Sequence, residues 1–309
     1  MEFLSPQYLS EAFEILDRRG KELKIAAGMT HILRFHTDFP QGLSPSLKAI
    51  LHIGNLEVLS DIREENQKYG IGSTATLSSL AADSYLARYA PAILDAVLAT
   101  STPQIRNRRT VGGEIGWGSF HSPLIVTLMA LGAKVRVRFQ ADTGENNHPG
   151  REDSVDLMEF YEGQLERTSS CENKQVTRSP RSKGQHLIMK VAIPDEMLHR
   201  GGTFSFFRGL RPKISMENSG VVLAVHGYTH QGVIQSAHMV ASGLWLDTLS
   251  TKLPLEGVRM GDTYIFEKLY SFCDRYSFDK YRREGPSGAQ LGLVVFGLLK
   301  EGFSHLMGN

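Results

Sequence analysis

The chain has 309 residues, with 34 Lys and Arg against 33 Asp and Glu and a formal net charge of +1. This length predicts about two domains, and a hydrophobic fraction of 41% is enough to bury a core in each. The near-zero net charge gives no long-range attraction toward a polyanion, which argues against nucleic acid as a partner.

The ends of the chain and its apolar runs bear on location. The sequence contains no uninterrupted run of about 18 apolar residues, so we expect no transmembrane helix. Residues 1–7 carry Glu2 and lack the basic and apolar segments of a signal peptide. We therefore expect a cytoplasmic protein without a membrane partner.

Few side chains indicate metal binding or catalysis. The two cysteines, Cys171 and Cys273, are too few for an iron–sulfur cluster, which needs about four thiolates or two thiolates and two histidines. His226 and His230 lie in a strand-and-turn pattern, where a spacing of four does not place them on one face, so we expect no metal site. No catalytic triad or pair of acid and base carboxylates emerges.

The first two thirds of the chain alternate between helical and strand patterns. Helices are predicted at residues 8–19, 77–82 and 90–100, with Thr76 as a helix cap and Pro91 in a first turn. Strands are predicted at residues 23–27, 69–71, 134–139 and 186–193. Two polar stretches, residues 141–154 and 166–185, are expected to be exposed loops.

The pattern changes near residue 200, where we place a domain boundary. Strands are predicted at residues 221–226 and 232–241, and helices at residues 264–275 and 289–300. The C-terminal third is therefore expected to hold a sheet followed by helices.

Three glycine-containing segments could bring backbone amides close to a phosphate. They are residues 25–31, residues 106–116 and residues 71–76. Each also has an ordinary interpretation: a common strand-to-turn junction, a tight turn beside a solvated basic face, and a helix cap, respectively. None is a Gly-x-Gly-x-x-Gly or Gly-x-x-x-x-Gly-Lys-Ser/Thr motif, so neither a Rossmann domain nor an NTPase is supported.

In order and spacing, these segments resemble the FAD-binding subunits of molybdenum hydroxylases, a family that includes the flavoproteins of carbon monoxide dehydrogenase and xanthine dehydrogenase. The most specific likeness is residues 101–113, which contain Gln104-Ile105-Arg106-Asn107 and end in Gly112-Gly113. Further similar segments are residues 27–30, 69–76, 130–133 and 204–222. The likeness covers nearly the whole chain.

The resemblance implies an α+β fold. Residues 1–200 would form a FAD-binding domain of the PCMH or vanillyl-alcohol-oxidase type, with subdomains at about 1–55 and 56–200. Residues 201–309 would form an α/β domain like the C-terminal domain of carbon monoxide dehydrogenase flavoproteins.

The resemblance also implies that FAD lies extended between the two subdomains. Its pyrophosphate would meet the amides of residues 27–31 and 110–113, and Met189 would lie against the flavin ring. Trp117 could stack on adenine or flavin, or could be a packed loop aromatic. The implied cofactor-binding residues are Ala26, Ala27, Gly28, Met29, Thr30, His31, Ile71, Gly72, Thr110, Gly112, Gly113, Glu114 and Met189.

Three positions depart from the family pattern. Glu114 replaces an asparagine, and an ionised carboxylate only accepts hydrogen bonds and repels phosphate. Pro123 replaces an aspartate and removes an acceptor. Met29 replaces a glycine, which is tolerated if φ at this position is negative.

The function implied is that of an oxidoreductase subunit of the xanthine dehydrogenase type. It would relay electrons from a [2Fe–2S] subunit through FAD to NAD⁺ or another acceptor, in a complex whose molybdenum-cofactor subunit oxidises the organic substrate. Two alternatives stay open. One is a non-catalytic assembly subunit that has lost FAD, and the other is a free-standing flavin oxidoreductase.

Overall fold

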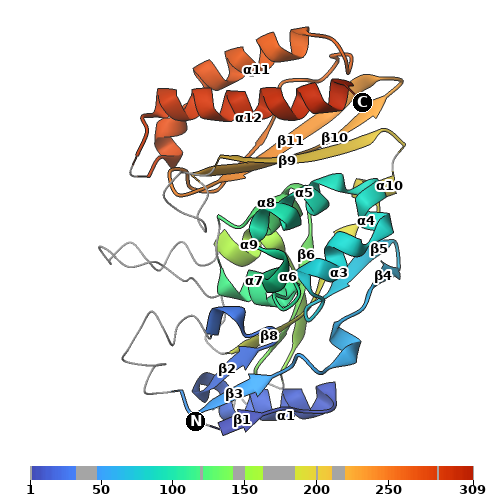
Figure 1. Cartoon of the computed structure of the whole chain (residues 1–309), viewed down its shortest axis with the longest axis vertical. Coiled ribbons are helices and arrows are strands. Elements are labelled where there is room, and N and C mark those ends of the chain that lie inside the picture. Colours follow the sequence, from blue (N-terminus) through green and yellow to red (C-terminus); the bar gives the residue numbers. More distant parts are fainter. Residues whose placement is uncertain are drawn as a thin grey trace. The chain divides into compact units, whose positions relative to one another are not determined.

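The computed structural model describes residues 2–32, 47–118, 121–141, 150–162, 185–199, 201–210, 220–283 and 285–308 (Figure 1). Contacts divide the chain into two compact units. Unit 1 comprises Met1–Ser79, Thr102–Gly118 and Ala133–Ile193, and unit 2 comprises Leu80–Ser101, Ser119–Gly132 and Pro194–Asn309. The division therefore differs from a single boundary near residue 200, because two segments from the predicted first domain pack with the C-terminal third. Cys171 and most of the predicted loop at 166–185 lie outside the described residues.

Unit 1 begins with a small parallel sheet in the order β1-β3-β2. Its strands are β1 (Glu2–Leu4), β2 (Leu23–Ala26) and β3 (Ala49–His52). Parallel strands of one sheet need crossover connections, and helix α1 (Leu9–Arg19) connects β1 to β2, the two strands that flank β3. Ala12 and Leu16 are one helical turn apart, so both face inward and join a buried cluster with Leu23 and Leu51.

The second sheet of unit 1 has five strands in the order β4-β5-β8-β6-β7. They are β4 (Ile62–Glu65), β5 (Lys68–Gly72), β6 (Lys134–Phe139), β7 (Glu152–Asp156) and β8 (His186–Pro194). The expectation of a loop throughout 141–154 is wrong at its end, because β7 pairs antiparallel with β6. Arg136 on β6 forms an ion pair with Glu152 across this edge, a cross-strand contact that helps a polar segment to join a sheet.

Short helices complete unit 1. They are α6 (Pro103–Arg106), α7 (Val111–Trp117) and α9 (Leu157–Glu162), and α3 (Leu77–Ala82) leads into unit 2. The predicted cap of α3 is confirmed, since the Ser79 N–H donates to Thr76 Oγ1 at 3.1 Å. Helix α7 was not predicted, and it is the helix that matters most for the site.

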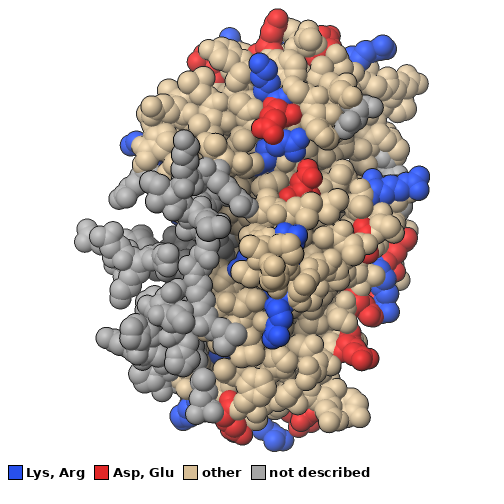
Figure 2. Space-filling model, in the orientation of Figure 1, with Lys and Arg blue, Asp and Glu red and all other residues tan. Residues whose placement is uncertain are grey.

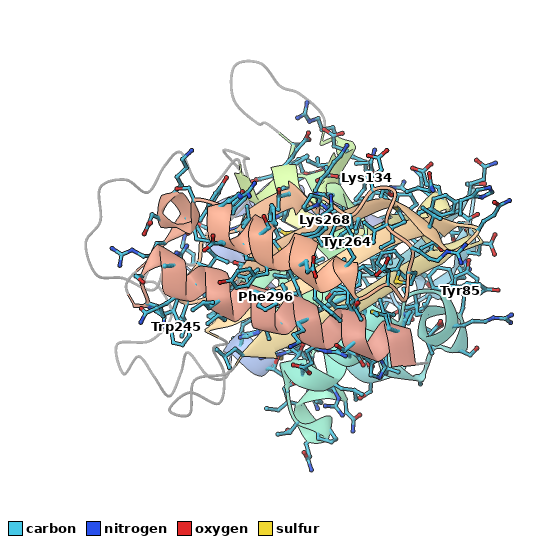
Figure 3. The ribbon with its side chains drawn as sticks, turned by 90° about the horizontal axis from the view of Figure 1, so that it is seen from above. Tyr85, Lys134, Trp245, Tyr264, Lys268 and Phe296 are labelled. Carbon is cyan, nitrogen blue, oxygen red and sulfur yellow. The ribbon has the colours of Figure 1, made fainter. Side chains whose placement is uncertain are left out.

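Unit 2 is built on an antiparallel sheet in the order β12-β11-β10-β9. Its strands are β9 (Thr203–Leu210), β10 (Val221–His230), β11 (Val233–Ser242) and β12 (Leu249–Lys252). Its helices are α4 (Ser84–Tyr89), α5 (Pro91–Thr100), α8 (Pro123–Ala130), α10 (Glu196–His199), α11 (Tyr264–Arg275) and α12 (Gly288–Gly308). Helices α5 and α8 cover one face of the sheet, while α11 and α12 lie side by side on the other (Figures 1 and 3). Both faces are therefore buried, as the near-continuous apolar run of β10 requires.

Helix α12 bears on the expectation that the chain has no transmembrane helix. It is the one helix among the described residues that is long and apolar enough to cross a membrane by length and composition, with a mean hydropathy of 1.2 over 18 residues. Its inward face carries Leu291, Val295 and Leu299, which belong to the core of unit 2. A core helix of a globular domain has the same composition, and packing explains this one.

Charges on the described surface are mixed. Figure 2 shows Lys and Arg interspersed with Asp and Glu on the face in view. This distribution agrees with the net charge of +1 and forms no broad basic patch on the described part of that face.

Candidate functional site

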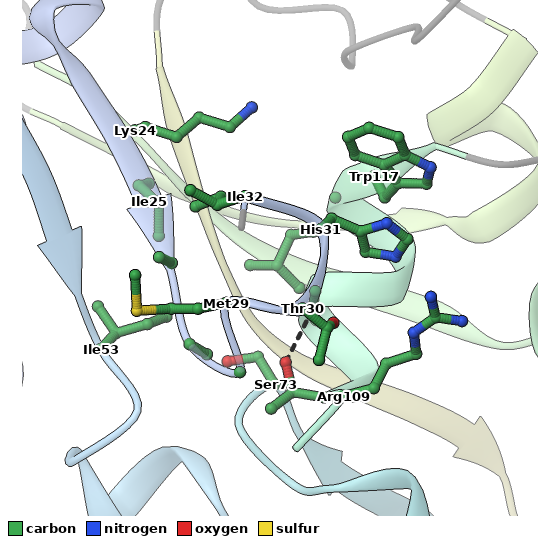
Figure 4. Close-up of a pocket in the computed structure, with 18 of the residues that line it drawn as sticks. Lys24, Ile25, Met29, Thr30, His31, Ile32, Ile53, Ser73, Arg109 and Trp117 are labelled. Carbon is green, nitrogen blue, oxygen red and sulfur yellow. Dashed lines mark hydrogen bonds between the residues drawn. The ribbon is translucent and has the colours of Figure 1, made fainter. Parts of the chain in front are cut away.

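A pocket in unit 1 gathers the segments that the sequence singled out (Figure 4). It lies where β2 ends, beside the start of α7 and the first residues of β8. Nine of the thirteen predicted cofactor-binding residues line it, namely Ala26, Ala27, Gly28, Met29, Thr30, His31, Thr110, Gly112 and Gly113. Segments about 80 residues apart in the chain thus share one cavity.

Two glycines allow this close approach. A Cβ on Gly28 would lie 1.8 Å from the carbonyl oxygen of Arg108, so the loop after β2 packs backbone to backbone against the residues before α7. A Cβ on Gly112 would lie 2.6 Å from the Cβ of Ser73. Each glycine is needed because another segment occupies the space of a side chain.

The segment after β2, a turn at residues 27–29 followed by a helical start at Thr30, offers free amides. Among the described residues, no acceptor is found for the backbone N–H groups of Gly28, Met29 and Thr30. Successive unpaired amides beside a cavity form a nest for an anion. This agrees with the phosphate-contacting role predicted for residues 27–31.

The amides at the start of α7 behave differently, which corrects the expectation for residues 110–113. The N–H of Val111 donates to Ala75 O at 3.0 Å, and that of Gly112 donates to Ser73 O at 2.8 Å. The Gly113 N–H donates to Thr110 Oγ1 at 3.1 Å, which makes Thr110 the N-cap of α7. These three amides already have protein acceptors. The paired glycines therefore line the pocket without side chains, but they do not form an amide nest.

Four predicted residues lie outside the pocket lining: Ile71, Gly72, Glu114 and Met189. Ile71 and Met189 are buried, and Met189 belongs to the cluster around α1. The Gly72 N–H donates to Asp61 O at 2.8 Å. At the flavin position assigned to Met189, the pocket instead presents its neighbour Ile188.

Two further polar residues line the pocket: Lys24, which the sequence analysis did not single out, and Ser73, which lies in the predicted phosphate-contacting segment 71–76. Lys24 lines it from β2 and has no ion pair with another described residue. Its side chain keeps solvent contact, although nearby protein atoms lower the pKa of its ammonium by burial. The Ser73 hydroxyl is buried without a partner among the described residues. The alternation of side chains along a strand could have identified Lys24, because it places this lysine on the face away from the core.

His186 adds a neutral ring to the wall of the pocket. Burial lowers its pKa to about 4, so the imidazole is uncharged at neutral pH. Its ring packs against Phe139 and Phe160, with centroid distances of 6.2 and 5.9 Å. The other basic side chains of the pocket lining are those of Lys24, His31 and Arg109.

Glu114 lies behind the lining in a charged cluster. Its Oε2 is 3.5 Å from Arg109 Nε and 3.8 Å from His31 Nε2, and both partners do line the pocket. The His31 ring stacks on Trp117 with centroids 4.4 Å apart, so one face of Trp117 is covered (Figure 4). The carboxylate is therefore screened from the pocket by two basic side chains. With the amide nest, Lys24 and the buried hydroxyl of Ser73, this donor set fits a phosphate that carries ribose-like hydroxyls.

The sequence predicts that methionine is tolerated at position 29 if its φ is negative, and the structure contradicts this condition. The φ of Met29 is +60°, in the left-handed region that favours glycine. We expect Met29→Gly to raise the free energy of unfolding by up to about 1 kcal/mol, because the strain of a side chain there exceeds the entropy cost of glycine. Chemical denaturation measures this change.

Ala87→Gly is the matched control for Met29→Gly. Ala87 is exposed in α4, where glycine should lower the free energy of unfolding by about 1 kcal/mol. If Met29→Gly destabilises the protein as much as Ala87→Gly does, the packing of Met29 outweighs its backbone strain.

Comparison with known sequences assigns the first two thirds of the chain. Residues 1–196 match the sequence profile of a family described as the FAD binding domain in molybdopterin dehydrogenase. The chain is also 29% identical over 147 residues to the 6-hydroxypseudooxynicotine dehydrogenase complex subunit alpha of Paenarthrobacter nicotinovorans. It is 27% identical over 120 residues to the carbon monoxide dehydrogenase medium chain of Hydrogenophaga pseudoflava. The matched parts span 47% and 39% of these relatives and 47% and 38% of the chain, so the chain covers about half of their length or less.

Comparison with solved structures covers the whole fold. A Cu,Mo-CO dehydrogenase chain superposes over 98% of both chains with a TM-score of 0.73 and 17% identity. A chain of quinoline 2-oxidoreductase from Pseudomonas putida 86 matches 99% of this chain and 98% of its own, with a TM-score of 0.72 and 15% identity. The predicted α+β class is confirmed by this fold.

Proposed function

The chain belongs to the family of FAD binding domains in molybdopterin dehydrogenases, and from this premise we propose that it is the FAD-binding electron-transfer subunit of a molybdenum hydroxylase complex. The observation that carries the proposal is the pocket of unit 1, where the loop at 27–31 meets the start of α7. Free amides, an ammonium and a buried hydroxyl there suit the phosphates and hydroxyls of a dinucleotide.

The residues of this chain bind and orient the cofactor. The amides of Gly28, Met29 and Thr30 would hold a phosphate, with Lys24 supplying its counter-charge. Ser73 would satisfy its buried hydroxyl on the ligand. Bound FAD would supply the redox chemistry, accepting electrons from a [2Fe–2S] subunit and delivering them to NAD⁺ or another acceptor.

The two alternatives find less support. Glu114 and Pro123 motivated an assembly subunit without FAD, but neither residue lines the pocket. Pro123 starts α8, and the Glu114 carboxylate lies 3.5 Å from the Arg109 guanidinium. A free-standing oxidoreductase needs an acid or base at the cofactor. Among the described residues, two histidines line the pocket, His31 and His186, and the lowered pKa of His186 leaves its ring neutral.

Reconstitution tests FAD binding directly. The purified chain is mixed with FAD, desalted and scanned for the visible flavin absorption. Thermal unfolding is followed in parallel, because FAD at 100 times its Kd should stabilise the protein by about 2.7 kcal/mol. Absence of both the flavin band and the thermal shift would contradict the proposal and favour the assembly subunit.

Gly113→Asp tests the position of the phosphate. Gly113 lines the pocket, so a carboxylate there should repel the ligand and weaken FAD binding by about 100-fold or more. An acidic residue in the first turn of α7 suits the helix dipole, so the apo protein should keep its fold. Titration of FAD into each variant gives the affinity, and circular dichroism gives the fold.

Gly113→Asn is the control of equal size without the charge. A Cβ at Gly113 approaches Thr110 Oγ1 to 2.8 Å, so a small loss of affinity from this contact is expected in both variants. Equal affinities of the Asp and Asn variants would show that no phosphate lies near Gly113.

The partners and the location are part of the proposal. Co-expression with candidate molybdenum-cofactor and [2Fe–2S] subunits should yield a stable complex that reduces NAD⁺ or another acceptor. Steady turnover of a small substrate by the isolated chain would support the free-standing enzyme instead. Cell fractionation should place the complex in the cytoplasm.

A further inference from the structure

We propose that Glu114 is a positioning residue that anchors residues 28–31, the turn and helix start after β2, through His31 and Arg109. The inference rests on the proposed FAD site, since that segment carries the amides of the phosphate nest. It concerns the chain without cofactor, however, so it can be tested separately.

The anchor is a buried carboxylate with two basic neighbours. The side chain of Glu114 is 4% exposed, and those of His31 and Arg109 are 16% and 17% exposed. Both neighbours approach the same oxygen, Oε2, at 3.8 and 3.5 Å, within ion-pair range, although neither contact has the geometry of a hydrogen bond. A carboxylate buried to this extent is costly unless it is paired, so the cluster holds together as a unit.

Helix α7 supplies a second contact to the same histidine. Trp117 follows Glu114 by three residues, so the two side chains share a face of the helix. The ring of His31 lies nearly parallel to that of Trp117, at an interplanar angle of 10°, while its Nε2 is directed to Glu114. Stacking on Trp117 and the nearby carboxylate of Glu114 together favour one orientation of the imidazole.

The segment needs such an anchor. Its amides at Gly28, Met29 and Thr30 have no acceptor among the described residues, and Met29 is held at a positive φ. Gly28 packs on Arg108, and the next residue, Arg109, reaches Glu114. Both ends of the nest are therefore fixed to the segment that starts α7, by backbone packing at Gly28 and by the carboxylate at His31.

Glu114→Gln tests the anchor in a Trp245→Phe background, where Trp117 is the only tryptophan. Gln keeps the shape of Glu and removes the charge. Without FAD, the emission of Trp117 should change in intensity and wavelength as His31 leaves the stack. With FAD, the Kd should rise about tenfold.

His31→Phe provides the matched control, because Phe can stack on Trp117 without a carboxylate partner. If Glu114 acts through His31, then Glu114→Gln should weaken FAD binding less in the His31→Phe background than alone. Should Glu114→Gln fail to fold, His31→Gln with Glu114 intact should give the same change of Trp117 emission and the same rise in Kd.

The outcomes separate this inference from the proposed function. Unchanged Trp117 emission in Glu114→Gln, or fully additive losses in the double variant, would overturn the positioning role. A wild-type chain that binds no FAD would overturn the proposed function alone, since the emission of the apo protein still reports the anchor.

Discussion

Replacing Gly28 with alanine should abolish detectable FAD binding and destabilise unit 1. The added Cβ would lie 1.8 Å from the carbonyl oxygen of Arg108 and 2.8 Å from its carbonyl carbon. These are backbone atoms that no rotamer change can move, so the loop must withdraw from α7. Overpacking of this kind costs about 1–3 kcal/mol, and it displaces the amide nest as well.

FAD titration and chemical denaturation measure the two effects of Gly28→Ala. Gly297→Ala serves as the control, because it lies in α12 with nothing within 4 Å of an added Cβ. Alanine there should raise stability by about 0.5–1 kcal/mol. Retention of wild-type FAD affinity by Gly28→Ala would mean that the loop after β2 does not hold the cofactor.

Replacing Phe303 with alanine should cost unit 2 about 3–5 kcal/mol. Phe303 is fully buried on α12, and its ring packs edge-on against Phe204 and Phe206 of β9 at centroid distances of 6.0 and 5.2 Å. Neighbouring Gly302 lies so close to Phe206 that a Cβ would approach the ring to 2.1 Å. The helix cannot move inward to fill the cavity without repacking this contact.

Urea denaturation measures the loss caused by Phe303→Ala, with separate probes for the two units in case they unfold independently. Leu293→Ala is the control on the same helix, since Leu293 is 60% exposed and its loss should change stability by no more than about 0.5 kcal/mol. Equal effects of the two variants would show that α12 does not pack on β9 as described.

Local patterns predicted many of the elements. The ranges predicted for α3, α11 and β6 agree with the structure to the residue, because each has a clear apolar periodicity or a cap. Helix α7 escaped prediction since its run of Val111, Gly112 and Gly113 has poor helix propensity. It forms because Thr110 caps it and because the Tyr161 hydroxyl donates to Ile115 O at 2.7 Å, a contact from a distant helix.

The sequence also predicted some features of the candidate site and missed others. Glycines, small residues and their order along the chain were sufficient to select the segments that line the pocket, since close backbone approach needs those residue types wherever it occurs. The roles of single atoms were not predictable. The amides of Val111 and Gly112 were expected to be free, but Ala75 and Ser73 accept from them.

The sequence by itself determined the family, the α+β class and the cofactor segments, because these depend on residue type, order and spacing. Tertiary structure alone decided what Glu114, Lys24 and Met29 do. Glu114 is screened because His31 and Arg109 converge on it, although His31 lies far from it in the chain. Lys24 lines the pocket from β2, and Met29 adopts a positive φ in the turn that follows this strand. Charge compensation and backbone strain arise from contacts between distant segments, which no local pattern encodes.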